Sequence, residues 1–429
     1  MKNKPLDRTL SPQDAKTLAL SALGGALEFY DFIIFVYFTA TISLLFFPPD
    51  TPSWLAQVQT YGIFAAGYLA RPLGGIIMAH FGDTVGRKKI FSLSIFMMAV
   101  PTLLMGLLPT YAQIGLLAPI LLLILRILQG AAIGGEVPGG WVFVSEHVPK
   151  KHVGLACGIL TCGLTFGILL GSQVALWVAQ QFSAEDGLAY GWRIAFILGG
   201  IFGLCAVLLR RHLQETPVFE SIKSQKNLAK SLPVKAVLTQ YPLQMVVSMV
   251  LTWLLSAGIV VVILMTPNFL QKLYGIARTD ALAANSVATL CLTVGCIFYG
   301  WLADRIGAGK TLAAGSLVLI GAVNLFYGNL PQNLMPHYAA AGFAVGVVGA
   351  IPSLLVTAFP ARIRFSGLSF SYNVSYAIFG GLTPVFVQYL MGQNYLSAPA
   401  LYVSVLAGLG VFIGLIYWQH NTAIAMDQA

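Results

Sequence analysis

The sequence predicts an all-α integral membrane protein with twelve transmembrane helices in two pseudo-symmetric six-helix halves. Composition is the first reason, because 57% of the 429 residues are hydrophobic and only 9% are charged. A soluble domain carries roughly 25% charged residues, so this chain has too little charge to cover a solvated surface. Recurring apolar segments of membrane-spanning length and a repeated loop sequence are the other two reasons.

The apolar segments form two groups of six, separated by a polar stretch. Lipid offers the backbone no hydrogen-bonding partner, and the segments lack the alternation of barrel strands, so each is predicted to be a helix. The expected division is an N-terminal half over 1–212, a cytoplasmic connector over 213–240 and a C-terminal half over 241–429. The segments lie at about 17–47, 54–81, 90–108, 113–146, 153–180, 192–212, 241–271, 281–303, 311–329, 335–359, 367–391 and 398–418.

The basic residues are distributed unevenly between the two sides of the predicted membrane. One set of loops, together with the N-terminus, carries 19 of the 24 Lys and Arg residues, whereas the opposite loops carry only Lys272 and Arg278. This asymmetry predicts that both termini lie in the cytoplasm, next to anionic lipid headgroups. The net charge of +9 is thereby explained, and nucleic acid is not expected as a partner because the basic residues do not cluster on one face.

A short loop sequence occurs once in each half. It reads Gly82-Asp83-Thr84-Val85-Gly86-Arg87-Lys88-Lys89 after the second segment and Ala303-Asp304-Arg305-Ile306-Gly307-Ala308-Gly309-Lys310 after the eighth. The aspartate and the first following glycine have the same offset in both copies, 304 − 83 = 307 − 86 = 221 residues. Such a repeat indicates duplication and predicts a substrate site near the membrane midplane, between the halves.

The first loop resembles the loop signature of the major facilitator superfamily, and Arg126-x-x-Gln129-Gly130 resembles its second motif. Other segments are similar to the metabolite:proton symporter family, which includes proline/betaine and organic-acid carriers. They are Ala26-Leu27-Glu28-Phe29-Tyr30-Asp31-Phe32, Arg71-Pro72-Leu73-Gly74-Gly75, Gly134-Gly135-Glu136, Gly191-Trp192-Arg193, Glu215-Thr216-Pro217-Val218-Phe219 and Arg362-Ile363-Arg364-Phe365-Ser366-Gly367. The resemblance implies a transporter of the plasma membrane, such as a bacterial inner membrane.

The resemblance also implies that the two loops act as gates on the cytoplasmic side. The gating residues would be Asp83, Gly86, Arg87, Lys88, Asp304 and Arg305. Asp83 could instead cap the N-terminus of a neighbouring helix, or the loop could be a solvated turn. Two positions depart from the family pattern: Ala308 replaces an expected arginine, and Val137-Pro138 replaces an aromatic residue and a glycine.

Five ionisable side chains lie deep inside predicted spans, where each costs about 2.5–3.5 kcal/mol on insertion scales. They are Glu28, Asp31, Arg71, Arg126 and Glu136. Counting about 1.5 Å per residue from the span ends places all five near the midplane. Helical spacing puts two of the acids on one face of the first span, and puts Arg126, Gln129 and Glu136 on one face of the fourth, so each face can line a central cavity.

Three acids and two bases leave at least one carboxylate without a fixed cation, which is the condition for proton exchange. Glu28 and Asp31 are the leading candidates for the coupling proton, with Glu136 as the competitor. The alternative is that all three acids pair with Arg71 and Arg126 and only hold the helices together.

A substrate carboxylate is expected to contact Arg126, whose planar guanidinium permits bidentate pairing, with Arg71 as a competing and more structural candidate. Predicted spans seven to twelve contain no Asp, Glu, Lys or Arg, which favours a monoanion or zwitterion over a di- or tricarboxylate. Aromatic rings could hold an ammonium group by cation–π contact, or could serve only as packing residues or interfacial anchors. The remaining candidate substrate residues are Gln129, Tyr30, Trp253, Tyr372, Asn373 and Tyr376.

The expected function is therefore proton-coupled symport of a small polar metabolite by alternating access. A uniporter or exchanger on the same fold is the alternative, and a non-transporting membrane sensor is more remote because the longest polar segment is only the connector. No nucleophile triad, nucleotide loop or metal-ligand spacing is found, so we expect no enzyme activity, no metal and no cofactor, with the proton gradient as the energy source. We expect a monomer to be functional.

Overall fold

A computed structural model describes residues 9–210, 215, 216, 220 and 233–427 of the chain. Some side chains within this part are not described, among them those of Glu28, Asp83, Arg87 and Arg278 and those of residues 418–427. Within the described part, twelve helices are long and apolar enough to cross a membrane, which confirms the predicted number of spans.

The N-terminal half contains six long helices, joined by the short elements α2 (Thr39–Leu45), α5 (Tyr111–Ile114), η1 (Lys150–His152), α8 (Ala184–Asp186) and η2 (Gly187–Gly191). Each long helix is largely apolar and is continuous from its first residue to its last. The six are α1 (Pro12–Tyr37), α3 (Ser53–Thr84), α4 (Arg87–Leu107), α6 (Leu117–His147), α7 (Val153–Gln181) and α9 (Trp192–Arg210).

The C-terminal half follows the short helix α11 (Pro233–Gln240) and also contains six spans. Three of the spans are α14 (Arg278–Ile306), α15 (Ala308–Gly328) and α20 (Ala398–Asp427). The other three change helix type within the membrane, at short segments of which the first two begin with a glycine and the third ends with one. They are α12 (Pro242–Ala257) with η3 (Gly258–Met265) and α13 (Thr266–Tyr274), α16 (Leu334–Val345) with η4 (Gly346–Gly349) and α17 (Ile351–Thr357), and α18 (Arg364–Ser375) with η5 (Tyr376–Gly380) and α19 (Gly381–Gly392).

Two predicted span boundaries were wrong because local backbone geometry interrupts a continuous apolar sequence. The first predicted segment, 17–47, is divided at Phe38, whose φ of −107° and ψ of 13° end α1 and begin α2. The fourth, 113–146, begins at Leu117 because Gly115 has a φ of 61° and ends the short α5. Glycine adopts such a positive φ without a steric penalty.

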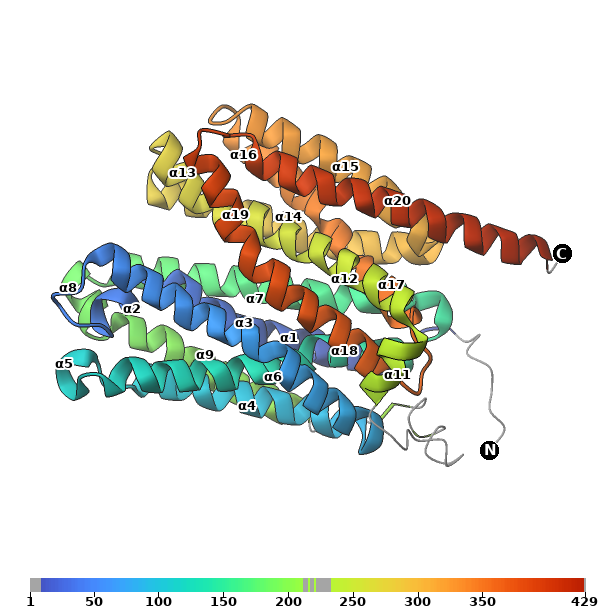
Figure 1. The fold of residues 1–429 in the computed structure, drawn as a ribbon, viewed down its shortest axis with the longest axis horizontal. Coiled ribbons are helices and arrows are strands. Elements are labelled where there is room, and N and C mark those ends of the chain that lie inside the picture. Colours follow the sequence, from blue (N-terminus) through green and yellow to red (C-terminus); the bar gives the residue numbers. More distant parts are fainter. Residues whose placement is uncertain (1–8, 211–214, 217–219, 221–232, 428–429) are drawn as a thin grey trace.

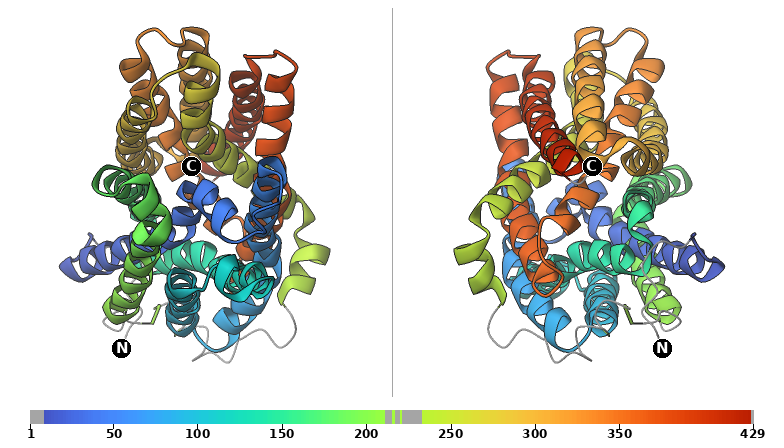
Figure 2. Two further views of the ribbon diagram at one scale, coloured as in Figure 1. Left: turned by 90° about the vertical axis from the view of Figure 1, so that its left-hand side faces the viewer. Right: turned by 90° about the vertical axis from the view of Figure 1, so that its right-hand side faces the viewer.

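The two halves lie side by side as separate helical bundles (Figures 1 and 2). We call the end of the molecule at which α1 begins and α20 ends the terminal side (Figure 1). The short α2, α5 and α8 lie at the other end, the opposite side. An even number of spans agrees with this arrangement, in which the first span begins and the last span ends on the same side (Figure 1).

One contact between the halves runs along most of α7 and α14. At the terminal side, a Cβ added to Gly158 would lie only 2.6 Å from the carbonyl oxygen of Cys296, so glycine is required for this close approach. Farther along, Thr165 donates a hydrogen bond to Thr293 at 3.1 Å. At the opposite side, Gln173 donates to Ser286 at 2.8 Å.

The second contact joins α18 to α3 and α6. The hydroxyl of Ser369 donates to the carbonyl oxygens of Gly75 and Gly134, at 3.1 and 3.2 Å. The side-chain amide of Asn373 donates to the Gly134 carbonyl at 2.6 Å. Gly82 packs against the ring of Phe365. These residues lie toward the terminal side of their helices, so the two halves are closed against each other at that side.

Candidate functional site

Arg126 lies in the middle of α6 and is fully buried. Its guanidinium carbon is 4.5 Å from the ring centroid of Phe35 on α1 and 4.9 Å from that of Phe64 on α3. Its Nη1 donates a hydrogen bond to Oε1 of Gln129, one turn farther along α6. The arginine is thus held at the contact of α1, α3 and α6.

Gln129 connects three helices of the N-terminal half. Besides accepting from Arg126, it donates from Nε2 to the hydroxyl of Thr102 on α4 at 2.8 Å and to the backbone carbonyl of Asp31 on α1 at 3.2 Å. All the polar atoms of its amide group therefore have partners, which fixes the orientation of the side chain.

The carboxyl group of Asp31 faces α9, inside the N-terminal half. The side chain is only 1% exposed, and neither carboxyl oxygen has a hydrogen-bonding partner among the described residues. A Cβ built at Gly199 would lie 2.6 Å from Oδ1, and one built at Gly203 would lie 2.9 Å from Oδ2. The expectation that this face lines a cavity between the halves was therefore wrong for Asp31, because helical spacing defines a face but not the helix that packs against it.

The other two candidate proton carriers are placed differently. The side chain of Glu28 lies outside the described residues. Glu136 on α6 is buried and accepts a hydrogen bond from the hydroxyl of Ser94 on α4. Tyr30, a candidate substrate residue next to Asp31, also points toward α9, where its hydroxyl donates to the carbonyl oxygen of Ala195 at 2.9 Å.

Arg71 lies in a cage of tyrosine rings that both halves supply. Its guanidinium carbon is 5.4 Å from the ring centroid of Tyr68 on α3, 5.5 Å from that of Tyr372 on α18 and 4.3 Å from that of Tyr376 in η5. The rings of Tyr68 and Tyr376 are nearly parallel, with centroids 6.1 Å apart. Two aromatic residues predicted to hold a substrate ammonium thus hold an arginine of the protein in this structure.

Trp253 belongs to a different aromatic group. Its ring stacks on Phe379 of η5 with centroids 3.9 Å apart, and its Nε1 donates to the hydroxyl of Tyr402 on α20 at 2.8 Å. These contacts lie within the C-terminal half. Trp253 is therefore not part of the cage around Arg71, although the sequence predicts it, with Tyr372 and Tyr376, as a candidate substrate residue.

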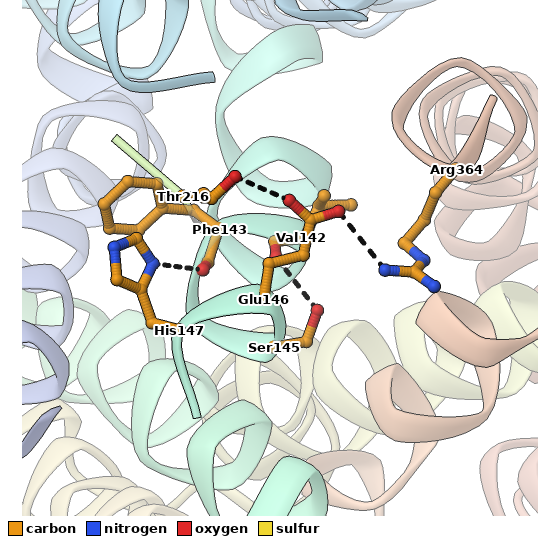
Figure 3. Close-up of polar contacts among 7 residues, drawn as sticks. All are labelled: Val142, Phe143, Ser145, Glu146, His147, Thr216 and Arg364. Carbon is orange, nitrogen blue, oxygen red and sulfur yellow. Dashed lines mark hydrogen bonds and ion pairs between the residues drawn. The ribbon is translucent and has the colours of Figure 1, made fainter. Parts of the chain in front are cut away.

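A buried glutamate at the end of α6 joins the halves on the terminal side (Figure 3). Oε1 of Glu146 lies 3.2 Å from Nη1 of Arg364, the first residue of α18. Its Oε2 accepts a hydrogen bond from the hydroxyl of Thr216 in the connector at 2.8 Å. Sequence reasoning missed Glu146, although Arg364 and Thr216 both lie in segments that carry the family resemblance.

Glu215, the residue before Thr216, caps α4. Both of its carboxylate oxygens accept from the backbone amide of Lys88 at 3.2 Å, in the first turn of the helix, which Gly86 precedes with a φ of 139°. A carboxylate at a helix N-terminus is stabilised by the helix dipole. The side chains of Asp83 and Arg87, predicted gating residues in the same loop, lie outside the described residues.

In the second copy of the repeated loop, Asp304 caps α7 across the interface between the halves. Its two carboxylate oxygens accept from the backbone amides of Gly154 and Leu155, both at 2.7 Å. Capping was the alternative raised for Asp83, and it is observed here at the equivalent residue. Arg305 lies over the ring of Trp301, 5.5 Å from the centroid, on its own helix. Among the described residues, no three His, Cys, Asp or Glu side chains are grouped to hold a metal ion.

Comparison with known proteins identifies the fold. The family model of the Major Facilitator Superfamily matches residues 31–384. The chain belongs to this superfamily. It is therefore a multi-pass membrane transporter and not an enzyme.

The relatives agree with the motifs found in the sequence. A Staphylococcus aureus relative, named provisionally as a proline/betaine transporter, is 32% identical over 95% of this chain and 89% of its own length. The ectoine/proline transporter ProP of Corynebacterium glutamicum is 30% identical, with 91% and 82% covered. The glycine betaine/proline/ectoine/pipecolic acid transporter OusA of Dickeya dadantii is 29% identical, with 93% and 82% covered. The expected resemblance to proline/betaine carriers is thus confirmed.

Solved structures share the fold at low sequence identity. The proton:xylose symporter XylE has a TM-score of 0.77 at 18% identity, with 95% of both chains covered. The human organic anion transporter MFSD10 has a TM-score of 0.68 at 13% identity, with 94% of this chain and 100% of that chain covered.

Proposed function

We propose that the protein is a proton-coupled symporter that carries a small zwitterion of the proline/betaine type by alternating access. The observation that carries the proposal is that two buried ionisable side chains, Arg126 and Asp31, lie on either side of Gln129, which bonds the guanidinium of Arg126 and the backbone carbonyl of Asp31. One group has the chemistry to bind a carboxylate and the other has the chemistry to carry a proton.

The substrate class follows from the charges and rings around Arg126. A guanidinium pairs with a carboxylate through two parallel hydrogen bonds, so a single arginine suits a single carboxylate. Aromatic rings continue from this site toward Arg71, with Phe35 stacked on Phe64 at 6.1 Å and Phe64 edge-on to Tyr68 at 5.0 Å. Ring faces attract quaternary ammonium groups, which suits the positive end of a zwitterion. The names of the relatives support this class.

We assign the proton to Asp31 of α1, whose carboxyl group is buried. An isolated carboxylate in an apolar contact is strongly disfavoured, whereas the protonated acid is tolerated. Asp31 can therefore take up a proton when it faces one side of the membrane and release it when the conformation changes. Glu28 and Glu136 remain the competing carriers.

The orientation of the protein in the membrane follows from the loop charges. The positive-inside distribution assigns the terminal side to the cytoplasm of a bacterial cell, so the closed contacts at Glu146, Asp304 and Ser369 form the cytoplasmic gate. Each chain contains both halves, so we propose the monomer as the functional unit. The driving force is the proton gradient, without a cofactor.

Uptake by purified protein in proteoliposomes tests the proposal. Labelled proline or betaine should accumulate when the outside is acidified, and an uncoupler should abolish the accumulation. A uniporter or exchanger would show counterflow without a response to the proton gradient. A sensor would bind substrate without counterflow.

A further inference from the structure

The carboxyl group of Asp31 occupies a slot formed by α4 and α9, which we call the glycine slot. Its walls are Gly199 and Gly203 on α9 and Ala99 and Thr102 on α4. A Cβ at Gly199 would lie 2.6 Å from Oδ1 of Asp31 and 3.0 Å from the methyl carbon of Thr102. A Cβ at Gly203 would lie 2.5 Å from the Cβ of Ala99. Only glycine at these two positions leaves room for the carboxyl group.

The walls of the slot provide no charge for Asp31. The residues of α4 and α9 that form it have no ionisable group, and both carboxyl oxygens lack a hydrogen-bonding partner among the described residues. On α1, the hydroxyl of Tyr30 donates its hydrogen bond to the Ala195 carbonyl, and the side chain of Glu28 lies outside the described residues. On α6, Arg126 donates to Gln129, whose amide nitrogen bonds the backbone carbonyl of Asp31.

Gln129 therefore connects the glycine slot to Arg126 through hydrogen bonds. Its Nε2 bonds the hydroxyl of Thr102, a wall of the slot, and the backbone of Asp31, while its Oε1 accepts from Arg126. Thr102 itself is anchored, because its hydroxyl donates to the Met98 carbonyl at 3.0 Å. A movement of Asp31 or Thr102 would thus displace the Gln129 side chain, which in turn holds Arg126.

We propose that Gln129 is a positioning residue that couples the proton on Asp31 to substrate binding at Arg126. The inference rests on the proposed proton symport. When Asp31 is protonated, the neutral acid fits the slot, and Gln129 holds Arg126 in place for the substrate carboxylate. When the proton leaves, the charged carboxylate is disfavoured in the slot and moves toward a hydrogen-bond donor. The backbone of Asp31 and the wall at Thr102 then shift, and Gln129 releases Arg126.

Thermodynamic linkage between proton and substrate binding determines whether the affinity for proline rises or falls with pH. If substrate binds better to the protonated form, a proton must bind better to the substrate-loaded form by the same factor. The apparent affinity of the wild-type protein for proline should therefore fall as the pH rises. Couplings of this kind are typically about 5–150-fold.

The experiment measures the apparent affinity for labelled proline at acidic and at alkaline pH in wild type and in Gln129→Leu and Thr102→Val. Gln129→Leu removes all three bonds of the amide, and Thr102→Val removes one of them without touching Arg126. Thr102→Val should still bind proline at acidic pH, whereas Gln129→Leu should bind it more weakly than wild type at every pH because Arg126 loses the amide that holds it. In both variants the pH dependence of the affinity should shrink to about twofold or less. The matched control is Thr60→Val, because Thr60 is a buried threonine of α3 whose hydroxyl donates to the Ala56 carbonyl of its own helix.

The outcomes separate this inference from the proposed function. If the wild-type protein shows neither proton-driven uptake nor a pH-dependent affinity, the symport proposal fails. If wild type is pH-dependent and Thr102→Val and Gln129→Leu keep the full dependence, the role of Gln129 is rejected while symport stands. If Gln129→Leu does not fold, Thr102→Val against Thr60→Val decides the result alone.

Discussion

Glu146 and Arg364 form an ion pair between the two halves of the molecule, with 3.2 Å between Oε1 and Nη1. The pair is asymmetric, because the side chain of Glu146 is fully buried whereas that of Arg364 is 21% exposed. Removing one partner of a buried pair leaves the other charge uncompensated, which costs more when the remaining group is the buried one. The two possible substitutions should therefore have unequal effects.

Arg364→Gln should open the terminal side more than Glu146→Gln does. The first removes the guanidinium that faces the buried Glu146 carboxylate, and such a loss costs the closed state up to about 3–5 kcal/mol. Glu146→Gln removes the carboxylate from Arg364, whose side chain is 21% exposed and can be solvated by water. Hydrogen exchange of residues 142–148 and 364–370 measures the opening, with Lys150→Gln, an exposed residue, as the control. Equal exchange in both variants would contradict the asymmetry.

Asp304→Ala should weaken the terminal-side contact of α7 with α14. Two backbone amides at the start of α7 lose their acceptor, and the loss of an N-terminal cap costs about 0.5–2 kcal/mol. Thermal unfolding of the purified protein should report a lower midpoint, and Asp304→Asn should lie between wild type and Asp304→Ala. Asp280→Asn, at an exposed position in the first turn of α14, is the control. An unchanged midpoint in Asp304→Ala would show that the cap is dispensable.

Arg126→Lys should weaken the binding of proline or betaine by about tenfold or more, because an ammonium group does not reproduce bidentate pairing. Isothermal titration of the purified protein measures the change. Arg193→Lys is the matched control, since Arg193 donates to the carbonyl oxygens of Gly106 and Leu108 at the end of α4 and is not placed at the site. If Arg126→Lys bound proline with wild-type affinity, Arg126 would not be the residue that binds the substrate carboxylate, and Arg71 would be the next candidate.

The sequence was sufficient to predict the number of transmembrane helices, but not which neighbouring helix each buried ionisable side chain faces. Span number follows from hydropathy, because a lipid-exposed backbone has few alternatives. The interruptions at η3, η4 and η5 were not predicted, since these segments are as apolar as the helices around them. Asp31 was recognised as a membrane-buried acid, yet its contact with α9 depends on two glycines that lie about 170 residues farther along the chain.

Glu146 was missed for a different reason. A glutamate next to a loop carries no insertion penalty in a hydropathy argument, so its burial becomes visible only when the connector and α18 pack over it. The signal available in the sequence was indirect: Thr216 and Arg364 both belong to segments that resemble the symporter family. Two polar residues of that kind, far apart in the chain, could have indicated a shared partner.

Gly199→Ala should disturb proton coupling without removing the substrate site. The added Cβ would lie 2.6 Å from Oδ1 of Asp31, so the carboxyl group must leave the glycine slot. Counterflow of proline should continue, whereas accumulation driven by a proton gradient should fall. Gly408→Ala serves as the control, because a Cβ there meets no atom within 4 Å. Normal accumulation in Gly199→Ala would show that the slot does not hold the coupling group.

The amide variants of the three membrane-buried acids decide which one carries the proton. An amide resembles the protonated acid but cannot release a proton, so the variant of the true carrier should exchange substrate and fail to accumulate it. We expect this behaviour for Asp31→Asn, because neither carboxyl oxygen of Asp31 has a hydrogen-bonding partner among the described residues that would hold it charged in the slot. Glu136→Gln should retain accumulation, since the Ser94 hydroxyl that bonds Glu136 can bond an amide oxygen equally well. Counterflow and gradient-driven uptake, measured side by side in Glu28→Gln, Asp31→Asn and Glu136→Gln, provide the comparison. If Asp31→Asn accumulates proline as wild type does while Glu28→Gln does not, Glu28 carries the proton. If Glu136→Gln is the one variant that does not accumulate proline, Glu136 on α6 carries it.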